Sequence, residues 1–71
     1  MEELNKLINS NLNIILIRCR TNRADLAKKI GISQSALSQR LAGNITLDTI
    51  AKICTALNIK PHELFRELKL K

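Results

Sequence analysis

The chain has 71 residues and carries 12 basic side chains against 6 acidic ones, which gives a net charge of +6 at pH 7. This length allows one domain at most, and an apolar content dominated by Leu, Ile and Ala, with Phe65 as the single aromatic residue, favours helices over sheet. The longest apolar run, residues 14–17, is far too short to cross a bilayer, so we expect no membrane segment.

A first helix is expected from about Glu3 to Cys19. Apolar residues recur along it at helical spacing and form one face, namely Ile8, Leu12, Ile15, Leu16 and Cys19. A second apolar stripe, made of Leu7, Ile14 and Ile17, projects from a different side. This stripe is either core or the contact surface of a partner, and we expect most of it to be core.

Two short helices with a tight turn between them follow. The second helix begins after Asn22, which is a good N-cap, and ends at Gly31, because glycine readily adopts the left-handed conformation of a helix stop. The third helix has Ser33 as its N-cap and runs to Ala42, with a glycine closing it. A helix, a tight turn and a second helix at this spacing predict a helix-turn-helix.

The fourth and fifth helices complete the chain. The fourth begins at Thr46 and has an inward stripe made of Leu47, Ile50, Ile53, Cys54 and Leu57. Pro61 suits the first turn of the fifth helix, which presents Leu64, Phe65 and Leu68 on one side. These three are either core or the interface of a dimer. The sequence thus predicts an all-α, compact five-helix bundle that forms a single domain over residues 1–71.

The outward side of the third helix is polar but largely uncharged. It presents Gln34, Ser35, Ser38 and Gln39. A glutamine amide can pair bidentately with adenine in the major groove, and a serine hydroxyl can bond several base edges or a phosphate. These side chains either read bases, which we favour, or simply face solvent.

Positive charge is concentrated around these two helices. Residues 18–40 have a net charge of +5, because Asp25 alone opposes Arg18, Arg20, Arg23, Lys28, Lys29 and Arg40. Such a concentration suits a phosphate backbone, although it can also be ordinary solvated charge.

The stretch NRADLAKKIGISQSALSQRLAGN, followed by TLDTIAKICTALNIKPHELF, resembles the lambda repressor/Cro-like (XRE-type) helix-turn-helix family over roughly residues 12–68. The resemblance implies a five-helix domain, usually a dimer, that binds operator DNA and regulates transcription. It places Gln34, Ser35 and Gln39 where the family usually reads bases. It also places Ser33 and Asn44 where contacts to the DNA backbone are common, and we expect Asn22 to share this role.

Two residues depart from the family pattern. Arg23 stands where the family often has a glutamine that touches a phosphate, and it can make the same contact as a charged donor. Arg40 stands where an aliphatic residue is common, which leaves the rotation of the third helix open. Arg40 either reaches a phosphate beside the groove or is a surface arginine paired with a carboxylate.

We expect no catalytic, metal or cofactor site. His62 stands alone at a helix start, and neither a glycine-rich phosphate loop nor a pair of carboxylates in a plausible cleft is present. Cys19 and Cys54 lie far apart without a CxxC motif, and we interpret both as reduced core thiols of a cytoplasmic protein. The starting methionine and the set of helices favour a whole protein over a fragment.

The sequence therefore predicts a DNA-binding transcriptional regulator, in particular a repressor, that binds near-palindromic operator DNA as a homodimer. The third helix, about residues 33–42, enters the major groove, and Leu64, Phe65 and Leu68 form the dimer interface. No small-molecule ligand is expected. The alternative is a protein-interaction module of the same fold, an antirepressor or antitoxin-like partner, which does not read DNA itself.

Overall fold

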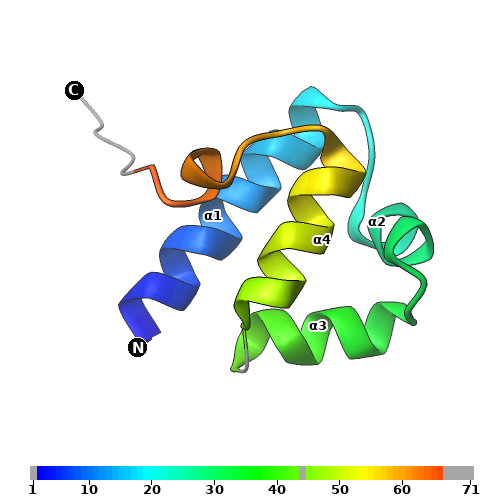
Figure 1. The fold of residues 1–71 in the computed structure, drawn as a ribbon, viewed down its shortest axis with the longest axis horizontal. Helices are drawn as coiled ribbons and strands as arrows, with labels where there is room; N and C mark the ends of the chain where they lie inside the picture. Colours follow the sequence, from blue (N-terminus) through cyan, green and yellow to red (C-terminus); the bar gives the residue numbers. More distant parts are fainter. Residues whose placement is uncertain (1, 44, 67–71) are drawn as a thin grey trace.

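The computed structural model describes residues 2–43 and 45–66, and these fold into four α-helices and one short 3-10 helix (Figure 1). The elements in chain order are α1 (Glu2–Arg18), α2 (Arg23–Ile30), α3 (Gln34–Ala42), α4 (Leu47–Leu57) and the 3-10 helix η1 (Pro61–Leu64). The all-α prediction is confirmed for these residues. No helix among them is long and apolar enough to span a bilayer.

The helices enclose one aliphatic core. α2 packs against both α3 and α4, while α1 packs against α3 and η1, and Figure 1 shows α3 lying crosswise at one end of α4. Every α-helix contributes buried side chains, and the core comprises Ile8, Leu12, Ile15, Leu16, Leu26, Ala27, Leu37, Leu41, Ile50, Ile53, Cys54, Leu57 and Leu64. The predicted apolar faces of α1 and α4 are thus largely confirmed.

Leu47 and Cys19 were predicted to lie inside, and both predictions are wrong. Leu47 is 82% exposed, because it is the first residue of α4 and lies before the part of the helix that packs against its neighbours. Cys19 is exposed, because α1 ends at Arg18 and the chain turns away through Arg20, whose φ is +54°. Cys54 is buried as predicted. Burial is the main cause that raises the pKa of its thiol, and the negative charge of Glu63 raises this pKa further.

The second apolar stripe of α1 is also not core. Ile17 is 75% exposed, Ile14 is exposed and Leu7 is half-buried. The reason is geometric, since α1 has a single buried face around Leu12. At 100° per residue, Ile17 falls almost opposite to Leu12 on the helix.

The expected fifth helix is, within the described residues, the single turn of η1. Pro61 does open it, as predicted, and Leu64 is buried. The helix ends at Leu64, and the chain at this end is bonded to Asn11 of α1, which is 4% exposed. Its Nδ2 donates to the backbone carbonyls of Leu64 at 2.7 Å and Arg66 at 2.8 Å. In a continuing α-helix these two carbonyls would accept hydrogen bonds from N–H groups of the same helix. Here they accept from α1 instead.

Candidate nucleic-acid interface

The turn between α2 and α3 has the geometry predicted from its glycine. Gly31 has a φ of +91°, and its N–H donates to the carbonyls of Ala27 at 2.9 Å and Lys28 at 3.2 Å. The N–H of Ile32 also reaches the carbonyl of Ala27, at 3.0 Å, so the chain reverses tightly against the last turn of α2. The start of α3 is therefore fixed relative to the end of α2.

Side-chain caps define where both helices of this unit begin. The Oδ1 of Asn22 accepts from the N–H of Asp25 at 2.9 Å, and the Oγ of Ser33 accepts from the N–H of Ala36 at 3.0 Å. Both N-cap predictions are confirmed. Because both residues are exposed, the Ser33 hydroxyl proton and the Asn22 amide group remain available to an external acceptor.

The rotation of α3 is settled by its two buried leucines. Leu37 and Leu41 are both almost completely buried, which turns the opposite side of the helix to solvent. That side carries four exposed residues, namely Gln34, Ser35, Ser38 and Gln39. Within the described part of the chain, none of these four side chains forms a hydrogen bond to another protein group. No other described residue therefore occupies the donors and acceptors of these side chains, which can bond a ligand.

Arg40 lies beside this face and is half-buried. Since Leu41 occupies the core, Arg40 replaces the expected aliphatic residue on the flank of α3 and leaves the inward face intact. The ion pair found among residues 2–43 and 45–66 joins Lys52 to Asp48 at 3.2 Å and does not involve Arg40. Asn44, the other residue expected to contact DNA here, lies outside the described residues.

Arg23, the first residue of α2, is held by α1. Its Nη1 donates to the Oδ1 of Asn9 at 3.1 Å, and its Nη2 donates to the Oδ1 of Asn13 at 2.8 Å. Partial burial lowers the pKa of Arg23, but a guanidinium titrates so far above neutrality that it stays charged. Neither asparagine was predicted to belong to the site, although the spacing of Asn5, Asn9 and Asn13 on one face of α1 was a visible signal.

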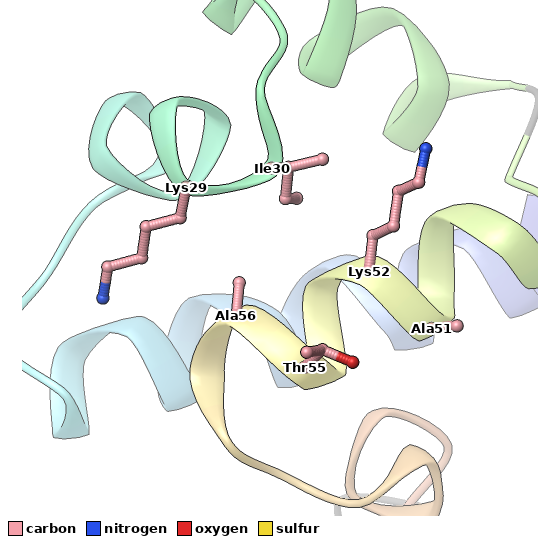
Figure 2. Close-up of a pocket in the computed structure, with 6 residues that line it drawn as sticks. All are labelled: Lys29, Ile30, Ala51, Lys52, Thr55 and Ala56. Atoms are coloured by element: carbon pink, nitrogen blue, oxygen red, sulfur yellow. The ribbon is translucent and has the colours of Figure 1, made fainter.

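A hollow between α2 and α4 lies apart from the polar face of α3. It has a volume of about 300 Å³ and is lined by Lys29, Ile30, Ala51, Lys52, Thr55 and Ala56 (Figure 2). The ammonium groups of Lys29 and Lys52 point away from each other in this view, and Lys52 is already paired with Asp48. None of the residues expected to contact DNA lines this hollow.

The residues expected at a dimer interface differ in how far they are exposed to solvent. Leu64 is 0% exposed and belongs to the core of the single chain, so it offers no surface to a second copy in this conformation. Phe65 is 38% exposed, and Leu68 lies outside the described residues. Phe65 and the exposed Leu47 border a second hollow, of about 410 Å³, between α1 and the start of α4.

Comparison of the sequence with protein-family models assigns most of the chain to a family of DNA-binding domains. Residues 11–66 match the family model of the Cro/C1-type HTH DNA-binding domain, which spans the helix-turn-helix unit and most of the core. Neither the curated proteins nor the solved structures contained a match to the chain.

Proposed function

The chain belongs to the family of Cro/C1-type helix-turn-helix DNA-binding domains, and we propose from this that it is a sequence-specific transcriptional repressor. In this proposal it acts in the cytoplasm as a homodimer on near-palindromic operator DNA. α3 enters the major groove of each half-site, and the bound dimer blocks access of the polymerase.

The observation that carries the proposal is the solvent-facing side of α3. Four short polar side chains lie there without protein partners among the described residues, on a helix whose other side is fixed by Leu37 and Leu41. A major groove about 12 Å wide admits a helix of this kind. Uncharged amides and hydroxyls can both donate and accept, so they can read base edges without repelling phosphates.

The DNA backbone is contacted from the starts of the two helices. Asn22 and Ser33 cap α2 and α3, and each helix start carries a partial positive charge and unpaired N–H groups that favour phosphate. Arg23 adds a full positive charge at the start of α2. Arg40, on the flank of α3, and Asn44, in the following turn, complete the proposed set of backbone contacts.

Dimerisation is proposed to occur where exposed apolar side chains gather. Phe65 and Leu47 are large, exposed and border the same hollow, and a second copy that covered them would remove apolar surface from water. Two copies then address half-sites separated by one helical turn, about 34 Å.

The test begins with selection of bound sequences from a random duplex pool and measurement of affinity at several salt concentrations. We expect the affinity to fall steeply as salt rises, because bound phosphates release counterions. Gln34→Ala and Gln39→Ala each weaken binding to the selected site by about 1–3 kcal/mol and change binding to random DNA little.

Thr55→Ala provides the matched control, since Thr55 is an exposed polar residue on α4 that lines the separate hollow between α2 and α4. It should leave both affinities unchanged. Equal losses on selected and random DNA for the glutamine variants would show that these side chains do not read bases.

A protein-interaction module is the second candidate, and the exposure of Ile14 and Ile17 favours it. These side chains form an apolar strip on the outer side of α1 that a protein partner can cover. Absence of salt-dependent duplex affinity in the wild-type protein, even at low ionic strength, would favour this candidate over the repressor.

A further inference from the structure

We propose that Asn9 and Asn13 are positioning residues, which hold the Arg23 guanidinium in place for a DNA phosphate without neutralising its charge. The proposal rests on the proposed function and extends it to α1, a helix outside the helix-turn-helix unit. It gives the side-chain oxygens of these two asparagines a role in binding DNA.

The first observation is the chemistry of the two acceptors. Both oxygens that accept from Arg23 belong to neutral amides, at 3.1 Å and 2.8 Å. Among the described residues no carboxylate forms an ion pair with this guanidinium. A carboxylate in either position would make a stronger bond to the arginine, but it would also cancel the charge. The amides fix the orientation of the side chain and leave its positive charge uncompensated.

The second observation is that Arg23 still has N–H donors that no described residue uses. A guanidinium has five N–H groups, and the two bonds to α1 account for two of them. Arg23 is half-buried, so part of its side chain still reaches solvent. A long side chain that is already ordered loses less conformational freedom when a phosphate binds it.

The third observation links this arginine to the polar face. The Nδ2 of Asn9 donates to the carbonyl of Leu41 at 2.9 Å, in the last turn of α3, and to the carbonyl of Asn5 at 2.8 Å. One side chain therefore ties the arginine at the start of α2 to the end of α3. Asn9 thereby links the proposed backbone anchor to the helix that is proposed to read bases.

The decisive variant is Asn13→Asp, which has the same shape and places a carboxylate against Arg23. Asn13 is exposed, so the fold tolerates the change. We expect the midpoint of urea unfolding to stay the same or rise, because an ion pair replaces a neutral contact. DNA affinity should fall about tenfold, on both selected and random duplexes, because the new carboxylate compensates the positive charge that the phosphate would otherwise meet.

The control is the same substitution in an Arg23→Gln background, which removes the arginine but keeps the negative charge added at position 13. There Asn13→Asp should weaken binding by no more than about twofold, which is the general effect of one added negative charge. The slope of log affinity against log salt should become about one less steep in both Asn13→Asp and Arg23→Gln. Asn13→Ala should weaken binding about threefold in the wild-type background, and hardly at all without Arg23.

The outcomes separate the two proposals. If the wild-type protein shows no salt-dependent duplex affinity, the proposed function fails. If it binds DNA but Asn13→Asp has the same effect with and without Arg23, the proposed function stands and the positioning role is wrong.

Discussion

Gly31 and Gly43 follow α2 and α3, and they differ in the sign of φ. Gly31 has a φ of +91°, whereas Gly43 has a φ of −149°. A Cβ at either position would meet nothing within 4 Å, so any difference between their alanine variants reports backbone conformation and not a clash. Gly31→Ala should lower the free energy of unfolding by about 1 kcal/mol, because an L side chain disfavours the left-handed region.

Gly43→Ala serves as the matched control for this prediction. Its backbone is not left-handed, and an alanine also restricts the unfolded chain, so its unfolding free energy should change by less than about 0.5 kcal/mol. Both values come from urea titrations followed by circular dichroism in the far ultraviolet. Equal losses in the two variants would mean that the turn does not depend on the positive φ of Gly31.

Among the elements, η1 is held against α1 by hydrogen bonds from the side chain of Asn11. Asn11 is buried on α1 and donates hydrogen bonds to the carbonyls of Leu64, the last residue of η1, and of Arg66, two residues beyond it. Asn11→Ala should lower the free energy of unfolding by about 2–3 kcal/mol, because it leaves two carbonyls without a donor and opens a small cavity. Asn11→Leu should not restore it, since a leucine fills the space but donates nothing. Recovery in the leucine variant would show that packing, and not hydrogen bonding, fixes η1.

The ends of the helices could be predicted, because they depend on residues that are neighbours in the sequence. The caps formed by Asn22 and Ser33 and the left-handed stop at Gly31 all occur as expected. Each depends on contacts within a few residues, so the local sequence is sufficient.

The exposure of apolar side chains could not be predicted from the local sequence, because it depends on how the helices pack against one another. Ile17 has the residue type of a core position, but its exposure follows from which side of α1 meets the other helices. For the candidate site, the polar face of α3 followed from its helical spacing. The contacts of Arg23 did not, because they join residues 10 and 14 positions apart on two different helices.

Large exposed apolar side chains gather in two places among the described residues of the molecule. Leu47 and Phe65 form one apolar surface around the hollow at the start of α4, and Ile14 and Ile17 form the other near the end of α1. A chain of 71 residues buries a smaller fraction of its surface than a larger domain does, so covering either apolar surface would add stability. The first apolar surface is the one we propose for the homodimer.

Leu47→Lys tests that choice, and Ile17→Lys is its counterpart with the same charge change. Both residues are largely exposed, so each substitution should alter the stability of a single chain by less than about 0.5 kcal/mol. We expect sedimentation equilibrium to show a dimer for the wild-type protein and for Ile17→Lys, but a monomer for Leu47→Lys.

The same two variants connect assembly to DNA binding. A dimer binds its second half-site as an intramolecular event, which can raise affinity by a factor of about 10² or more. Leu47→Lys should therefore lose most of its affinity for a two-half-site duplex and retain its affinity for a single half-site, whereas Ile17→Lys should retain both. Both variants add one positive charge, so the change in net charge is the same and does not by itself explain a loss of affinity in one of them. Loss of the dimer in Ile17→Lys alone would move the interface to α1 and contradict the placement proposed here.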